Sequence, residues 1–119
     1  MSKKNILIVD DDKTFVDVVS QILVENDFDV IQTYSGFDAF KALEKKEVDL
    51  ILLDIVMPDF DGLEFCRVAK KMKPNIPVII VTGQESQVVQ SSRKFGADEI
   101  IYKPFKMSVL LDNIKNFIK

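Results

Sequence analysis

The chain has 119 residues, of which 47% are hydrophobic and 29% charged, as in an ordinary globular protein with one hydrophobic core. The net charge of −3 provides no basic surface for nucleic acid, and no apolar run approaches the roughly 18 residues that span a bilayer. The absence of histidine excludes histidine-based triads, histidine-ligated zinc and a phosphohistidine on this chain.

The single cysteine, Cys66, excludes an internal disulfide bond and suits a reducing compartment. It falls within a helical pattern, so we expect a small buried residue rather than a reactive thiol. The N-terminal residues MSKKN lead straight into an apolar run and leave no room for a signal peptide. We therefore expect residues 1–119 to form a single cytoplasmic domain that does not bind membranes.

Short apolar runs and helical patterns alternate along the whole chain. This alternation predicts an α/β fold, a doubly wound five-stranded parallel sheet with right-handed crossovers and five helices on its two faces. Uniformly apolar strands suit the interior of such a sheet, whereas Asp29, Gln32 and Thr33 favour an edge position for the second strand. The predicted strands are Ile6–Val9, Val30–Thr33, Leu50–Leu53, Val78–Val81 and Ile100–Tyr102.

The helices are predicted from apolar residues that recur at intervals of three and four. We expect Asp12 and Ser35 to cap the first two helices. The 85–95 segment has a thin apolar face, with Ser91 and Ser92 at core positions, and predicts a helix that is either solvated or able to move and bind partners. The predicted buried faces are Phe15, Val19, Ile22 and Leu23; Ala39, Phe40 and Leu43; Phe65, Val68, Ala69 and Met72; Val88, Val89 and Phe95; and Met107, Leu110, Leu111, Ile114 and Ile118.

Carboxylates follow two of the predicted strands. Asp10, Asp11 and Asp12 come after the first strand, and Asp54 comes after the third. The carboxyl ends of parallel strands meet at one edge of an open sheet, where ligands bind in such folds. Carboxylates gathered there repel one another, a conflict that a divalent cation resolves. An all-oxygen donor set favours Mg²⁺ (or Mn²⁺), unless the acids are kept apart and solvated.

A hydroxyl and an amine follow two further strands at the same edge. Thr82-Gly83 ends the fourth predicted strand, and Lys103-Pro104 ends the fifth. Beside a metal-bound carboxylate, a hydroxyl and an ammonium group are what a phosphoryl group or another oxyanion needs. The Lys103-Pro104 bond is a candidate for the cis form, which would direct the lysine inward.

Four sequence segments resemble, in their order along the chain, the receiver domain of bacterial two-component response regulators, including the chemotaxis-type single-domain proteins. The segments are ILIVDDD, DLILLDIVMPDFDG, VIIVTG and GADEIIYKPF, and the resemblance extends roughly from Lys4 to Ile118. It implies a flavodoxin-like sheet with the strand order 2-1-3-4-5.

The resemblance implies a signalling phosphoacceptor rather than a conventional enzyme. A histidine kinase, a phosphotransfer protein or a small phosphodonor would give its phosphoryl group to Asp54, the nucleophile. Asp10 and Asp11 correspond to the acidic pair that holds Mg²⁺, with Asp54 and the backbone carbonyl of Val56 as further ligands. Lys103 corresponds to the lysine that pairs with the phosphoryl oxygens.

Other positions correspond to residues that control switching and the lifetime of the phosphoryl group. Thr82 corresponds to the hydroxyl that moves toward the phosphoryl group. In the family this movement is coupled to an aromatic residue in the fifth strand, where this chain has Ile100, so we expect Ile100 to repack rather than swing. Gly83, Val56 and Gln84 correspond to positions that govern access to the phosphoryl group.

The expected partners are a histidine kinase or phosphotransfer protein and a downstream output protein or domain that docks on the fourth helix, fifth strand and fifth helix. We expect a monomer or a weak, phosphorylation-dependent dimer. The main alternative is a receiver-like module that binds partners without phosphorylation. A flavodoxin-like cofactor site is disfavoured because the first loop offers three acids. An aspartate phosphohydrolase is disfavoured because Val56 stands where a second aspartate is usual.

Overall fold

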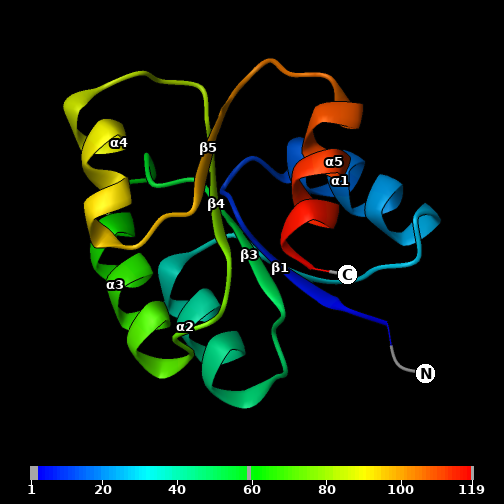
Figure 1. The fold of residues 1–119 in the computed structure, drawn as a ribbon, viewed down its shortest axis with the longest axis horizontal. Coiled ribbons are helices and arrows are strands. Elements are labelled where there is room, and N and C mark those ends of the chain that lie inside the picture. Colours follow the sequence, from blue (N-terminus) through cyan, green and yellow to red (C-terminus); the bar gives the residue numbers. More distant parts are fainter. Residues whose placement is uncertain (1–2, 59, 119) are drawn as a thin grey trace.

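The computed structural model describes residues 3–58 and 60–118, which form a five-stranded sheet with helices on both of its faces (Figure 1). The strands are β1 (Asn5–Val9), β2 (Asp29–Thr33), β3 (Leu50–Leu53), β4 (Val78–Thr82) and β5 (Glu99–Tyr102). The helices are α1 (Lys13–Glu25), α2 (Gly36–Lys45), α3 (Gly62–Met72), α4 (Gln87–Ser91) and α5 (Met107–Phe117), and a 3₁₀ turn, η1, covers Ser92–Phe95.

The sheet is parallel throughout, in the order β2-β1-β3-β4-β5, which confirms the predicted flavodoxin-like, doubly wound fold. The apolar strands β1, β3 and β4 lie in the interior and are buried on both faces, whereas the more polar β2 lies at an edge as predicted. Val9 pairs with Leu53, and Leu53 pairs with Ile80. β1 and β3 therefore end at the same level and β4 runs two residues further, so the residues that follow these strands share one edge.

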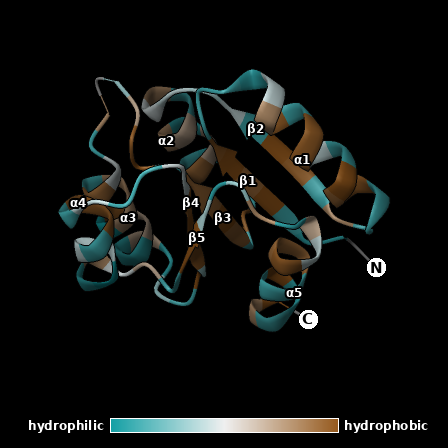
Figure 2. Ribbon diagram, turned by 90° about the horizontal axis from the view of Figure 1, so that it is seen from above, coloured by the Kyte–Doolittle hydropathy of each residue, from teal (hydrophilic) through white to brown (hydrophobic). Residues whose placement is uncertain are grey.

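Two apolar layers lie on the two faces of the sheet. α1 and α5 cover one face, and α2, α3 and α4 cover the other (Figure 1). Because side chains alternate along a strand, Leu7 and Val9 join the layer beneath α2 and α3, while Ile6 and Ile8 join the layer beneath α1 and α5. Seen from above, the strands form an apolar band between the helices (Figure 2). No helix within residues 3–58 and 60–118 is long and apolar enough to cross a membrane.

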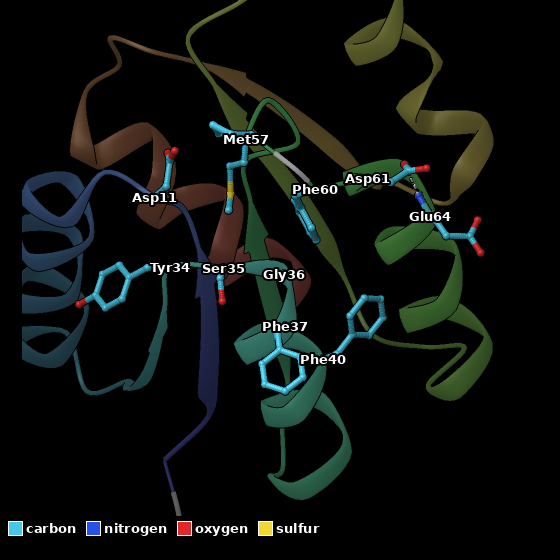
Figure 3. A pocket seen from close by; sticks show the side chains of 11 residues that line it. Asp11, Tyr34, Ser35, Gly36, Phe37, Phe40, Met57, Phe60, Asp61 and Glu64 are labelled. Atoms are coloured by element: carbon cyan, nitrogen blue, oxygen red, sulfur yellow. Dashed lines mark hydrogen bonds between the residues drawn. The ribbon is translucent and has the colours of Figure 1, made fainter.

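Four helices begin with side-chain caps close to the carboxyl edge of the sheet, and Ser86, whose hydroxyl oxygen accepts the Val89 N–H, caps α4. The side chains of Asp12, Ser35 and Asp61 each accept a hydrogen bond from the backbone N–H three residues later, and Figure 3 shows the Asp61 cap. The caps at Asp12 and Ser35 confirm the prediction. Each cap fixes the point at which the chain turns from the sheet edge into a helix.

The 85–95 segment is less regular than predicted. The five-residue helix α4 continues as η1, which ends at Gly96 with a φ of 108°. Val89 is fully buried, but Val88 is 51% exposed. Ser92 is buried and its hydroxyl donates to the Val89 carbonyl oxygen over 2.6 Å. The thin apolar face is confirmed, whereas the prediction of one continuous helix is wrong, because so little apolar surface holds the segment in a regular form.

The predicted buried faces of the other helices pack on the sheet, with differences near the helix ends. Phe15, in the first turn of α1, is only half-buried, and Met72, the last residue of α3, is 44% exposed. Cys66 completes the buried face of α3 and is fully buried, as predicted for a core residue. Burial raises the pKa of its thiol to about 11, so the thiol stays protonated and unreactive at neutral pH.

A matched pair of glycine variants tests how closely α3 packs on the loop after β3. A methyl group at Gly62 would lie 2.6 Å from the backbone Cα of Ile55. We predict that Gly62→Ala lowers the free energy of unfolding by about 1–3 kcal/mol, the usual cost of overpacking. A methyl group at Gly83 meets no atom within 4 Å, so Gly83→Ala should change stability by no more than about 0.5 kcal/mol. Urea unfolding measures both, and equal stabilities would contradict the close approach at Gly62.

Candidate functional site

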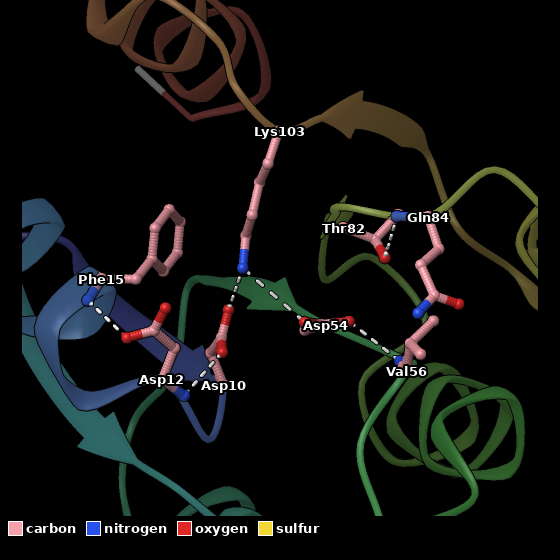
Figure 4. A network of polar contacts seen from close by, with 8 residues as sticks. All are labelled: Asp10, Asp12, Phe15, Asp54, Val56, Thr82, Gln84 and Lys103. Carbon is pink, nitrogen blue, oxygen red and sulfur yellow. Dashed lines mark hydrogen bonds and ion pairs between the residues drawn. The ribbon is translucent and has the colours of Figure 1, made fainter.

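Four strands bring Asp10, Asp54, Thr82 and Lys103 to one region at the carboxyl edge of the sheet (Figure 4). Asp10, Asp54 and Lys103 each follow the last residue of a strand, and their backbone N–H groups still donate to carbonyls of the neighbouring strands over 3.2, 2.9 and 2.8 Å. The sheet ladder therefore holds the backbone of these three residues, and their side chains extend from a rigid base.

The ammonium group of Lys103 lies between two carboxylates. Its Nζ is 2.7 Å from Asp10 Oδ2 and 3.7 Å from Asp54 Oδ2. The other oxygen of Asp10 accepts the Asp12 backbone N–H over 2.9 Å. The Asp10 side chain is only 3% exposed, so this ion pair is shielded from water and both of its carboxylate oxygens have a partner. The Lys103-Pro104 bond is cis, as predicted.

Asp54 is a nearly buried carboxylate whose negative charge is disfavoured. Its Oδ1 accepts a hydrogen bond from the Val56 N–H over 2.9 Å. Burial is the largest cause that raises the pKa of Asp54, and the charges of Asp10 and Asp11 raise it further. The Val56 N–H and the Lys103 ammonium lower this pKa but do not reverse the shift. A further positive charge beside Asp54 would therefore stabilise its ionised form.

Asp11 is the exposed member of the three acids, whereas Asp10 and Asp54 are buried. It is exposed and lines a cavity of about 510 Å³ together with aromatic side chains from α2 and the neighbouring loops (Figure 3). Across residues 3–58 and 60–118, no three acidic or cysteine side chains are arranged to hold a metal ion. The predicted gathering of Asp10, Asp11 and Asp54 around a metal ion therefore stays a prediction for Asp11, whose charge acts on Asp54 from an exposed position.

The remaining donors fit a hard divalent cation. The carboxylates of Asp10 and Asp54 and the carbonyl of Val56 offer only oxygen atoms, and Mg²⁺ binds through one or two carboxylates while it keeps several water molecules. The mutual repulsion that raises the pKa of Asp54 is the repulsion that such an ion relieves. The Lys103 ammonium supplies positive charge at the same place.

The β4–α4 side of the site carries Thr82, Gly83 and Gln84. Thr82 is fully buried, and its hydroxyl accepts the Gln84 backbone N–H over 3.4 Å, on the side of Asp54 away from Asp10 (Figure 4). Gly83 and Gln84 are exposed, and Val56, across from them, is half-buried. The exposed Gly83 and Gln84 therefore form an open side of the site. The Thr82 hydroxyl is buried beneath them and belongs to a local turn.

Ile100 in β5 has a different environment from Tyr102. Ile100 pairs with Ile80 and packs partly against the apolar layer on the α3 and α4 side of the sheet. Tyr102 pairs with Thr82 and is 39% exposed. An aliphatic side chain therefore occupies the strand position that the family resemblance associates with an aromatic switch.

Sequence reasoning missed one neighbour of the site, Phe15. Its ring lies beside the Lys103 ammonium, with Nζ 4.0 Å from the ring centroid (Figure 4). The helical pattern assigned Phe15 to the buried face of α1, and its place in the first turn after the acidic loop was the only signal that it could reach the sheet edge.

A doubly wound sheet with buried aspartates and a lysine at its carboxyl edge defines the class of aspartate-based signalling domains. The chain belongs to the response regulator receiver domain family, whose model matches residues 6–115. Receiver domains are signalling phosphoacceptors rather than conventional enzymes, they use Mg²⁺, and they interact with histidine kinases and output domains.

Solved structures of receiver domains resemble this chain over almost its whole length. A CheY-like receiver domain protein from Methanospirillum hungatei is 36% identical over 97% of this chain and 93% of that chain, with a TM-score of 0.92. The BeF3-activated receiver domain of DrrB, a Thermotoga maritima OmpR/PhoB homologue, is 31% identical over 98% and 97% of the two chains, with a TM-score of 0.88. Thermotoga maritima TrrA in complex with Mg²⁺-BeF is 29% identical over 97% and 99%, with a TM-score of 0.87.

The raised pKa of Asp54 has a testable consequence for stability. In the folded chain the ionised form is disfavoured, so the stability penalty is absent below the ordinary pKa of 3.8, grows as the pH rises from there to the higher folded pKa, and is constant above it. In metal-free buffer, we predict that Asp54→Asn is more stable than the wild type at neutral pH and that this gain shrinks toward pH 4. Urea unfolding between about pH 4 and pH 8 measures it.

The exposed Asp112→Asn serves as the control and should change stability little at any pH. An Asp54→Asn variant less stable than the wild type at neutral pH would contradict the raised pKa.

Proposed function

We propose that Asp54 is the phosphoryl acceptor of this receiver domain. The observation that carries the proposal is the Lys103 ammonium, which is paired with Asp10 and stands 3.7 Å from Asp54 Oδ2. The Val56 N–H holds the Asp54 Oδ1, so Oδ2 is the oxygen left to act as the nucleophile.

In the proposed reaction, Asp54 Oδ2 attacks the phosphorus atom of a phosphohistidine on a histidine kinase or phosphotransfer protein. An O–P bond forms, the P–N bond breaks, and the departing imidazole takes up a proton from water. With acetyl phosphate, Asp54 Oδ2 would attack the phosphorus atom in the same way, the P–O bond to the acetyl group would break, and acetate would leave. Asp54 itself does not need to be protonated or deprotonated during transfer, since it attacks in its ionised form.

Asp10, Asp11, Asp54 and the Val56 carbonyl are the proposed ligands of Mg²⁺ (or Mn²⁺), which neutralises charge as the anionic phosphoryl group meets a carboxylate. Asp11 would have to turn from its cavity toward Asp10 to take part. The Mg²⁺-BeF complex of TrrA supports magnesium at this kind of site. The all-oxygen donor set of this chain supports it independently.

Lys103 and Thr82 are proposed to hold the transferred group. Once a phosphoryl group adds its negative charge to Asp54, the Lys103 ammonium gains a second strong acceptor and can leave Asp10. The Thr82 hydroxyl, now in a long hydrogen bond of 3.4 Å, has a weak contact to give up. Gly83, Val56 and Gln84, which border the open side of the site, are proposed to govern water access and therefore the phosphoryl lifetime.

The wider assignment follows from the same proposal. Residues 1–119 would form one cytoplasmic receiver that takes its phosphoryl group from a histidine kinase or phosphotransfer protein and acts on an output protein or domain. It would do so as a monomer or a weak, phosphorylation-dependent dimer. A chemotaxis-type role is supported by the match to a CheY-like receiver domain protein. The relatives also include an OmpR/PhoB homologue, so the match to the CheY-like protein does not by itself decide the role. Pull-down of a separate output protein tests the chemotaxis-type role.

Switching is proposed to run from Thr82 through Ile100 to α4, η1 and the β5–α5 surface. Val89 is the one fully buried hydrophobic side chain among the described residues of α4 and η1, so this segment should respond most to a pull on Thr82. We predict that beryllium fluoride with Mg²⁺ changes amide exchange in residues 85–102 more than in β1 or α2. Hydrogen-exchange mass spectrometry measures the difference.

Thr82→Val keeps the side-chain shape but removes the hydroxyl, and it should reduce that change in amide exchange. Equal exchange with and without the phosphoryl mimic would overturn the proposed route.

Intact-mass analysis tests the acceptor itself. After incubation with acetyl phosphate and Mg²⁺, the wild type should gain the mass of one phosphoryl group, and Asp54→Asn should gain none. Chelation of the metal should prevent the gain, and Asp112→Asn should behave as the wild type.

Absence of any gain in a folded protein that still binds Mg²⁺ would contradict the proposal. That outcome would favour the alternative, a receiver-like module that binds its partners without phosphorylation.

A further inference from the structure

The Phe15 ring and the Lys103 ammonium form a contact that the proposed function does not use. The two residues come from distant parts of the chain, the first turn of α1 and the end of β5, yet Nζ lies 4.0 Å from the ring centroid (Figure 4). We propose that Phe15 is a positioning residue that holds the Lys103 ammonium in the site while its anionic partner changes. This inference rests on the proposed role of Lys103.

One contact holds the Phe15 backbone and another holds its ring. The Phe15 backbone N–H donates to Asp12 Oδ1 over 3.1 Å, the hydrogen bond that caps α1. The ring also meets Phe105 edge to face, with centroids 6.1 Å apart and planes at 82°. Phe105 lies two residues after Lys103, so the same short segment supplies both the ammonium and the ring that supports Phe15. The contact between the Phe15 ring and Lys103 is therefore held in place by neighbouring groups and is not an incidental approach of a mobile side chain.

A ring face suits a cation that must exchange partners. It attracts an ammonium group through its quadrupole, more strongly where water is partly excluded, and the Lys103 side chain is only 22% exposed. The ring accepts no strong, directional hydrogen bond, so it does not compete with Asp10 or with an arriving phosphoryl group for the ammonium protons. Phe15 can therefore keep the ammonium near the reacting atoms in both states, whereas an acidic neighbour would retain it.

The competing explanation is that Phe15 merely packs against the aliphatic part of the lysine side chain. Apolar packing depends on the size of the side chain, whereas attraction to the ring face depends on the electron density of the ring. Fluorine atoms withdraw electron density while they change ring size little. A series of fluorinated phenylalanines at position 15 therefore separates the two explanations.

The test incorporates phenylalanine with one, two, three and five ring fluorines at position 15 of the full chain and measures the rate of phosphorylation by acetyl phosphate at fixed Mg²⁺. We expect a stepwise fall with each addition of fluorine, reaching roughly five- to thirty-fold, the range of a partly desolvated cation–π contact. Phe15→Leu should be as slow as the most fluorinated ring, and Phe15→Tyr should retain most of the rate. A rate that is independent of fluorine content would overturn the proposal.

Phe105 provides the matched control, because it belongs to the same aromatic pair and its ring is not the one beneath the ammonium. The same fluorine series at position 105 should leave the phosphorylation rate within about two-fold of the wild type, since no cation among residues 3–58 and 60–118 lies over that ring. An equal gradient at both positions would show a general packing effect and contradict a specific role for Phe15.

A double-mutant cycle tests the contact without any phosphoryl transfer. Phe15→Leu, Lys103→Met and the double variant are compared by urea unfolding. The effect of Phe15→Leu on the unfolding equilibrium constant should shrink by about two- to ten-fold when Lys103 is already methionine. Additive effects would contradict the contact. A wild type that shows this coupling but takes up no phosphoryl group would leave Phe15 and Lys103 paired and refute the proposed acceptor chemistry instead.

Discussion

The ion pair between Lys103 and the two aspartates is the interaction on which the rest of the site depends. A lysine that follows the outermost strand β5 reaches 2.7 Å from Asp10 and 3.7 Å from Asp54, which follow the inner strands β1 and β3. Two carboxylates this deeply buried repel each other and are costly to ionise, as the raised pKa of Asp54 records. The site therefore needs a cation at all times, and the ammonium group meets that need.

This charge balance is also what makes the site responsive. A buried ion pair is sensitive to the loss or gain of one partner, because the remaining charge is then left uncompensated. A phosphoryl group on Asp54 would add a strong acceptor for the ammonium and change the balance at Asp10. The proposed chemical event at one carboxylate would thereby be converted into a rearrangement of side chains that follow three different strands.

The structure separates a rigid part from a more loosely held part on the two sides of Asp54. The sheet ladder holds the backbone of Asp10, Asp54 and Lys103. On the other side, the exposed Gly83 and Gln84 lead into α4, where Val89 is the only fully buried hydrophobic side chain described. The positions that would carry the chemistry are firmly held, and the segment proposed to carry the signal is weakly held, which is the distribution that a switch requires.

The sequence was sufficient for features that depend on strong local patterns. Apolar strands, the caps at Asp12 and Ser35 and the polar edge strand β2 follow from burial and hydrogen bonding within a few residues. The parallel direction of the strands alone predicts that one edge of the sheet carries Asp10, Asp54, Thr82 and Lys103. Details that depend on tertiary contacts were not predictable.

The exposed position of Asp11, beside a cavity lined by residues from other segments, depends on tertiary packing, and the break between α4 and η1 depends on how little apolar surface the segment buries. The contact of Phe15 with Lys103 joins residues 88 positions apart in the chain, which no local pattern reveals.

A crystal structure with Mg²⁺ and beryllium fluoride tests the central claim most directly. The account predicts beryllium fluoride on Asp54 Oδ2, with Lys103 Nζ moved from Asp10 to a hydrogen bond with a fluorine atom while it remains over the Phe15 ring. A lysine that stays paired with Asp10, or beryllium fluoride bound away from Asp54, would contradict it.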